Sequence, residues 1–218
     1  MNIRDGNLEK AHQFYAKDDY ASSYALYEDL LRKDPEDREV LYEYGRAIFS
    51  EFGDLEKATH LFEHFLEIEP DSVVALLYLG TLYSMGYGKG YPEALPIYQR
   101  ILTLSRSNKE AMVNAFIGIG MLHHVPNSPV SYEEVITAFR KALEIDPQRA
   151  DAHQNLGVAL LEGDKRQEAW KELKIAENLL KKMGIPTEGV QKLLHVIERN
   201  ELFTRGPYIN LSSQLNWP

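Results

Sequence analysis

One helical pattern occurs five times along this chain, and it limits the possible folds more than any other feature of the sequence. In each copy a small or β-branched residue is followed four residues later by a large apolar residue, and three residues further on by another apolar one. Because these spacings follow the period of the α-helix, all three positions lie on one helical face. The pattern predicts five helices that bury the same face, formed by a small column (Ser23, Ala58, Ala94, Val135, Ala169), a large column (Tyr27, Phe62, Tyr98, Phe139, Leu173) and a third column (Leu30, Phe65, Ile101, Ala142, Ala176).

Prolines predict where three of these helices end. Pro35, Pro70 and Pro147 each follow Asp or Glu, twelve residues after the small column. Proline disfavours helical geometry in the residue before it, so the first, second and fourth copies are expected to end there. The third and fifth copies have Arg106 and Lys181 at this position instead.

A second helix, marked by a glycine, precedes the repeated helix in copies two to five. Gly45, Gly80, Gly120 and Gly157 each follow an apolar or aromatic residue. A glycine inside a helix costs about 1 kcal/mol relative to alanine, so four glycines in register need a structural reason. We expect each to lie in close contact with the partner helix of its hairpin, opposite the small column.

The segments YEYGRAIF, NLGVALLEGD, KATHLFEHFLEIEP and EEVITAFRKALEIDP resemble the tetratricopeptide repeat, and the resemblance covers about residues 4–182. The third copy, with LGTLYSMGYGKGYPEAL, is also similar to the related Sel1-type repeat, whose turn between helices carries extra glycines. The resemblance implies an all-α fold: a right-handed α-solenoid of about five helical hairpins, over residues 4–36, 37–71, 72–107, 111–148 and 149–182, within an array that spans residues 1–182.

Two further segments follow the array. A stack of hairpins has to cover its last apolar face with an atypical element, and residues 183–200 are expected to supply a capping helix with one apolar stripe. Residues 201–218 have neither helical period nor caps, yet they are rich in apolar side chains. Three interpretations of this C-terminal tail stay open: packing along the last helices, docking on a neighbouring copy or in the groove, and disorder.

The resemblance also implies a binding surface. In tetratricopeptide folds the first helix of each hairpin lines the concave face, so residues that flank its glycine are expected to point inward. The alternative for each residue is that it packs one hairpin against the next. Relatives that capture a C-terminal carboxylate use several Lys, Arg and Asn residues, and here only Arg46 and Asn155 qualify, so we expect no carboxylate clamp. The candidate groove residues are Tyr15, Tyr42, Arg46, Phe49, Leu77, Tyr78, Thr81, Met121, His124, Asn155 and Val158.

Composition restricts the partners. The chain has 33 acidic and 24 basic residues, a formal net charge of −9, which repels phosphate backbones and argues against nucleic acid. No apolar run approaches the roughly 20 residues of a membrane span, and the start, MNIRDGNLEK, is too charged for a secretory signal. We therefore expect a protein partner, no insertion into membranes and a cytoplasmic location.

The sequence contains no recognisable catalytic group. Without cysteine, thiol nucleophiles and thiolate zinc sites are excluded. His60 and His64 lie one helical turn apart, but HLFEH lacks the Glu that zinc proteases need after the first His, so a solvated helical face is the better interpretation. His123 and His124 are adjacent and should diverge, and the carboxylates of EDLLRKDPEDRE are interpreted as solvated. The prediction is no enzyme, no metal and no cofactor.

These features lead to one leading hypothesis and two alternatives. The leading hypothesis is a non-enzymatic adaptor or scaffold whose concave groove binds a peptide or helix of a partner protein, because an apolar and aromatic groove suits such a segment. In the second, the chain forms homo-oligomers through its C-terminal tail. In the third, it is an inhibitor or immunity-type protein that binds a specific basic target. The long turns 86–92 and 123–131 are either contact surfaces or tolerated variation.

Overall fold

The computed structural model describes residues 3–124, 128 and 130–199 of the chain. Within these residues the structure contains helices and no strand, which confirms the predicted all-α class. The C-terminal tail lies outside the described residues, so its three interpretations stay predictions. The helices are α1 (Ile3–Tyr15), α2 (Tyr20–Lys33), α3 (Arg38–Ser50), α4 (Leu55–Ile68), α5 (Val73–Ser84), α6 (Tyr91–Leu104), α7 (Lys109–Met121), the short 3-10 helix η1 (Leu122–His124), α8 (Tyr132–Ile145), α9 (Ala150–Glu162), α10 (Arg166–Met183) and α11 (Glu188–Glu198).

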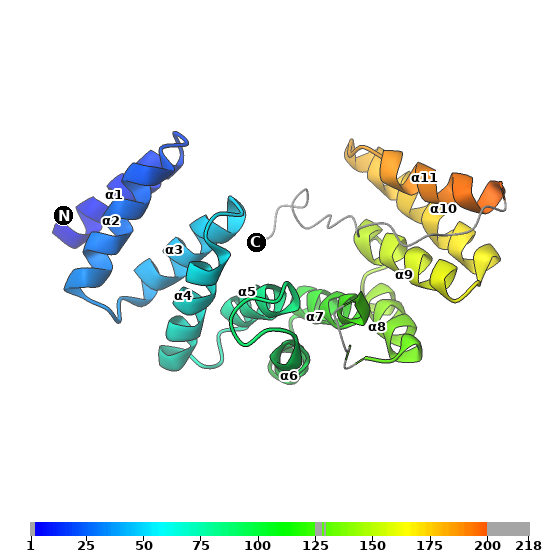
Figure 1. The fold of residues 1–218 in the computed structure, drawn as a ribbon, viewed down its shortest axis with the longest axis horizontal. Helices are drawn as coiled ribbons and strands as arrows, with labels where there is room; N and C mark the ends of the chain where they lie inside the picture. Colours follow the sequence, from blue (N-terminus) through cyan, green and yellow to red (C-terminus); the bar gives the residue numbers. More distant parts are fainter. Residues whose placement is uncertain (1–2, 125–127, 129, 200–218) are drawn as a thin grey trace. The chain divides into compact units, whose positions relative to one another are not determined.

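The chain divides into two compact units, residues 1–97 and residues 98–218, and the boundary falls inside α6. In the first unit α1 packs on α2, α3 packs on α4, and α4 packs on α5 (Figure 1). In the second unit α7 packs on α8, α9 on α10, and α11 on α10. Each unit is therefore built from helical hairpins that follow one another in sequence.

The three predicted columns form the buried faces of α2, α4, α6, α8 and α10. All five residues of the small column are fully buried, and none of the fifteen column residues is more than 6% exposed. Burial of large apolar side chains is the main stabilising contribution in a fold of this kind. The helical period in the sequence therefore identified the residues that hold each hairpin together.

Gly45, Gly120 and Gly157 of the preceding helices lie nearest to residues of the large column. A Cβ atom added to Gly45 would lie 3.1 Å from the ring of Phe62, and one added to Gly120 would lie 2.5 Å from the ring of Phe139. Gly157 faces Leu173 in the same way, at 2.7 Å. The predicted close helix contact is present at these three positions, but its nearest partner is the large column and not the small one; Gly157 also meets the small column, with its added Cβ 3.4 Å from the Ala169 carbonyl oxygen. The glycine makes room for a bulky residue of the partner helix.

Helix ends follow the local chemistry of the sequence. The residues before the three prolines, Asp34, Glu69 and Asp146, are the C-caps of α2, α4 and α8 and have non-helical backbone angles. At the other end, Asp37 caps α3 by accepting a hydrogen bond from the amide of Val40, and aspartates or asparagines cap α2, α4 and α7 similarly. These caps fix where each turn begins, and hence which side chains meet at the ends of the helices.

The turn between α5 and α6 is held against α4. Gly86, Gly88 and Gly90 all have positive φ angles, which glycine adopts without strain. A Cβ atom on Gly88 would lie 2.5 Å from a methyl carbon of Thr59 on α4, and the hydroxyl of Tyr83 donates a hydrogen bond of 2.7 Å to Glu63 on the same helix. Gly88 of this turn thus has a packing role inside the first unit.

Candidate partner-binding site

Four of the candidate groove residues come together in the first unit, and three of them are aromatic. The ring of Tyr78 on α5 stacks on Phe62, with 4.8 Å between ring centroids, and lies 5.1 Å from Phe49 and 6.2 Å from Tyr42, both on α3. Phe49 and Tyr78 are buried, whereas Tyr42 is half-buried. This aromatic cluster joins the second hairpin to α5, and the ring of Tyr42 keeps part of its surface accessible.

A charged pair lies beside the aromatic cluster. Arg46 donates a hydrogen bond of 2.6 Å to Glu43 one turn earlier on α3, and its side chain is 35% exposed. Burial and the neighbouring Tyr42 raise the pKa of Tyr78, and Arg46 opposes part of this rise. The hydroxyl of Tyr78 is therefore neutral at physiological pH, and the positively charged Arg46 lies beside the packed aromatic rings.

The other candidates of the first unit have different surroundings. Leu77 is buried, and half-buried Thr81 donates a hydrogen bond of 2.9 Å to the Leu77 carbonyl. Tyr15 lies in a separate row of tyrosines, with its ring 5.4 Å from Tyr20 and its hydroxyl donating to Glu51 at 2.8 Å. Burial chiefly, together with this hydrogen bond, raises the pKa of Tyr15 to about 12.

In the second unit the candidate residues lie on α7, η1 and α9. Met121 and Asn155 are half-buried and Val158 is buried. The side chain of His124 lies outside the described part of the structure. Among the side chains that are described, no hydrogen bond or ion pair joins Met121, Asn155 and Val158, so the second unit offers two partly accessible positions without a cluster like that of the first.

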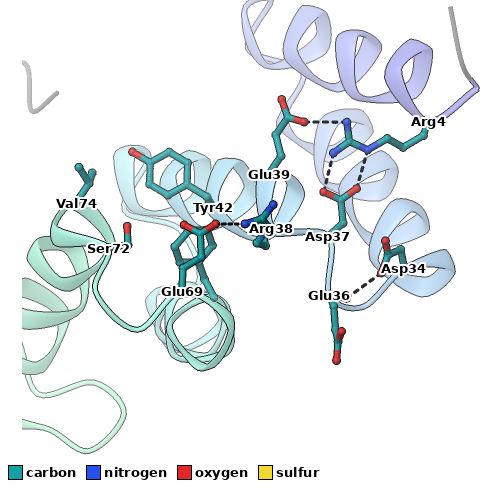
Figure 2. Close-up of a pocket in the computed structure, with 11 residues that line it drawn as sticks. Arg4, Asp34, Glu36, Asp37, Arg38, Glu39, Tyr42, Glu69, Ser72 and Val74 are labelled. Atoms are coloured by element: carbon teal, nitrogen blue, oxygen red, sulfur yellow. Dashed lines mark hydrogen bonds and ion pairs between the residues drawn. The ribbon is translucent and has the colours of Figure 1, made fainter.

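Sequence reasoning missed an open hollow at the helix ends of the first unit. Its volume is about 710 Å³, and Figure 2 shows side chains that reach it from α1, α3, α5 and the turns after α2 and α4. Of the candidate groove residues only Tyr42 lines it. The signal in the sequence was the run of carboxylates in DPEDRE, which was interpreted as a solvated surface. The lining residues are Arg4, Asp34, Glu36, Asp37, Arg38, Glu39, Tyr42, Phe65, Glu69, Ser72 and Val74.

Two arginines cross the hollow in ion pairs. Arg4 binds both carboxylate oxygens of Asp37, at 2.6 and 2.7 Å, and also pairs with Glu39 at 2.8 Å. Arg38 pairs with Glu69, as Figure 2 shows. The bidentate hydrogen bonds from Arg4 hold the pKa of Asp37 below its usual value, so this carboxylate stays ionised. The pairs connect α1 to the start of α3, and α3 to the end of α4.

A smaller notch lies on the second unit, between α10 and α11. Its volume is about 330 Å³, and Trp170 and Ile197 form its apolar part, with Arg166 and Lys171 at its rim. Trp170 is 39% exposed, and the ammonium group of Lys174 lies 5.7 Å from its ring centroid. An exposed tryptophan with basic neighbours is an accessible contact point, but no predicted groove residue is among the residues that line this notch.

The histidines do not converge on a metal site in the described structure. His60 is exposed and pairs with Glu56 and Glu63 on its own helix. Within residues 3–124 and 130–199 no group of three or more His, Asp or Glu side chains could hold a metal ion. In the same part of the chain, no helix is both long and apolar enough to cross a bilayer.

Comparison with known proteins bears on this fold. Two sequence-family profiles match the chain, one described as "Tetratricopeptide repeat" over residues 8–72 and one described as "TPR repeat" over residues 131–162. No curated protein matches the sequence.

Solved structures match over most of their length. A MamA structure from Desulfovibrio magneticus RS-1 is similar with a TM-score of 0.67 and 18% identity, covering 84% of this chain and 97% of that one. YrrB, described as a TPR protein with an unusual peptide-binding site, has a TM-score of 0.61 and 21% identity, covering 85% and 90%. PilW, described as a type IV pilus biogenesis factor, has a TM-score of 0.65 and 15% identity, covering 92% of both chains.

The buried columns, the hairpin pairs and these neighbours define an all-α helical repeat solenoid. The two profile matches show, more narrowly, tetratricopeptide repeats over residues 8–72 and 131–162 of the chain.

Proposed function

We propose that this protein is a non-enzymatic adaptor whose groove binds a peptide or helix of a partner protein. The observation that carries the proposal is the arrangement on α3, where half-buried Tyr42 and partly exposed Arg46 lie beside the aromatic cluster of Phe49, Phe62 and Tyr78. Rigid aromatic side chains next to an arginine are typical of residues that dominate the binding energy of protein interfaces. The tetratricopeptide fold supports the same role.

The cluster has two tasks in this proposal. Phe49, Phe62 and Tyr78 form a packed base that loses little conformational entropy when a partner binds. Tyr42 and Arg46 supply the accessible contacts. In the second unit, Met121 and Asn155 are the partly accessible candidate positions, and we propose that they also contact a partner protein.

Site-specific photo-cross-linking in the native host tests this directly. A benzophenone amino acid at position 46 is expected to give a discrete covalent adduct with a partner protein, which mass spectrometry then identifies. Glu56, exposed on the outer helix α4, is the matched control position. The same comparison in the second unit uses Asn155 and, as its control, exposed Glu144 on α8.

The pattern of adducts decides the result. An adduct from position 46 that position 56 does not give supports the groove. The same adduct from both positions, or from position 56 alone, contradicts it. Once the partner segment is known, Tyr42→Ala should weaken its binding by about tenfold or more, since truncation of an aromatic anchor costs roughly 2 kcal/mol, whereas Glu56→Ala should leave the affinity unchanged.

A further inference from the structure

The negative charge of this protein belongs to its first unit. Residues 1–97 contain 19 acidic and 9 basic residues, whereas residues 98–218 contain 14 acidic and 15 basic residues. The net charges are therefore −10 and +1. A field of this sign around the first unit attracts cationic groups and raises their rate of encounter.

Within that unit, the hollow of Figure 2 holds more carboxylates than its arginines can pair. Five acidic residues and two arginines line it. Arg4 is engaged with Asp37 and Glu39, and Arg38 is engaged with Glu69. In the described structure Asp34 and Glu36 take part in no ion pair; Asp34 accepts a hydrogen bond of 3.1 Å from the backbone amide of Glu36. One side of the hollow thus carries carboxylates whose charge is not neutralised.

The other side of the hollow carries apolar side chains next to Ser72. Val74, the second residue of α5, is 39% exposed, and it lies with half-buried Tyr42 and buried Phe65. In Figure 2, Val74 and Tyr42 are on the opposite side of the Arg38–Glu69 pair from Asp34 and Glu36. A ligand that fills the hollow therefore meets an apolar surface and an acidic surface in succession.

The arrangement and volume of the hollow indicate which kind of cationic group it can bind. The carboxylates do not converge as metal ligands do, because the described residues include no group of three or more that could hold a metal ion. A volume of about 710 Å³ is that of a site for an organic group of several atoms and not for a single ion. A basic side chain with a flexible apolar stem fits both surfaces, since its stem packs on apolar groups while its charge stays near carboxylates.

We infer that this hollow binds a basic and apolar segment of a partner protein, in which a lysine or arginine side chain meets Asp34 and Glu36 while an adjacent apolar side chain meets Val74 and Tyr42. The inference rests on the proposed adaptor function and names the chemistry of its ligand. It also places the contact at the helix ends, where Tyr42 is the one predicted groove residue that lines the hollow.

To test this, peptides that bind the full chain are selected from a random library of 12-residue peptides with amidated C-termini. Selected peptides are expected to share a lysine or arginine next to an apolar residue. The affinity of the best peptide is then measured by fluorescence anisotropy for the parent and for Glu36→Lys. Glu67→Lys is the matched control, because Glu67 is exposed on α4, outside the hollow, and its substitution changes the net charge equally.

Glu36→Lys should weaken the peptide by about tenfold, and Glu67→Lys by less than about twofold, since only the first brings like charges together. A peptide in which the basic residue is replaced by Glu should regain affinity for Glu36→Lys. Equal losses in the two variants, or selected peptides without a basic residue, overturn the inference. If cross-linking from position 46 still captures a partner in that case, the adaptor function stands and only the ligand chemistry is wrong.

Discussion

Replacing single glycines by alanine should separate helix propensity from helix contact. Gly6 on α1 has no atom within 4 Å of an added Cβ, so Gly6→Ala adds a better helix former without a clash. At Gly120 on α7 the added Cβ would lie 2.5 Å from the ring of Phe139. Both substitutions are made inside helices, so the difference between them reports the contact.

The magnitude follows from these distances. Alanine in place of glycine gains about 1 kcal/mol of helix propensity, and Gly6→Ala should stabilise the protein by up to that amount. Ordinary carbon contacts are about 3.5–4.0 Å, so Gly120→Ala forces a shift of about 1 Å. Phe139 is 1% exposed and cannot move without displacing the core of its hairpin. Such overpacking costs about 1–3 kcal/mol, which leaves a net loss of about 1 kcal/mol.

Thermal unfolding followed by far-ultraviolet circular dichroism measures this. For a chain of this length 1 kcal/mol corresponds to about 2–4 °C in melting temperature. Since Gly6→Ala should melt above the parent and Gly120→Ala below it, the melting temperatures of the two variants should differ by about 4–8 °C. Gly45→Ala, with its Cβ 3.1 Å from the ring of Phe62, should fall between them. A melting temperature of Gly120→Ala equal to or above that of Gly6→Ala would refute the contact between α7 and α8.

Three further predictions concern polar groups. Burial lowers the pKa of His153, but its hydrogen bonds, chiefly with Glu172 at 2.7 Å, outweigh this and raise the pKa above 6.5. Its stabilisation is therefore complete below pH 6.5 and is lost as the pH rises through the folded-state pKa, so urea unfolding should show a loss of stability above pH 6.5 that His153→Gln lacks. Hydrogen bonds, first among them that from Lys181, lower the pKa of Glu177 to about 2. The stabilisation from Glu177 is therefore complete above pH 4.5 and is lost as the pH falls toward about 2, and Glu177→Gln should abolish this pH dependence of the unfolding free energy. Ser131→Ala removes the capping box of α8 and should cost about 1 kcal/mol in the same assay.

The hairpins were predictable from the sequence because their signals are local. The three column positions of one copy, such as Ala58, Phe62 and Phe65, lie within two turns of one helix, so the helical period alone identifies their common face. A proline after an acidic residue likewise acts on its own neighbour. The partner of Gly120 was predicted incorrectly because it depends on the axial offset between two helices, and the packing of side chains across the hairpin determines this offset.

The groove prediction depends on a geometry that one helix does not contain. Tyr42, Phe49 and Tyr78 satisfy the same sequence rule, yet Tyr42 is partly accessible and the other two are buried. A side chain on the predicted inner face of a hairpin can either stay accessible or be covered by the next hairpin, and the angle between successive hairpins decides which. That angle results from contacts between repeats, such as the stacking of Tyr78 on Phe62.

The hollow was missed for a related reason, and its cause lies in the caps. Asp37 appears in the sequence as one more carboxylate of an acidic run, but as the N-cap of α3 it is fixed at a helix end, where Arg4 of another helix reaches it. Arg38 and Glu69 are likewise brought together from the start of α3 and the end of α4. Because these pairs engage both arginines, other carboxylates in the turn after α2 are left without an ion-pair partner in the described structure. The acidic run that the sequence analysis interpreted as an ordinary solvated surface therefore forms an acidic surface of the hollow, because the nearby arginines are paired in contacts between helices.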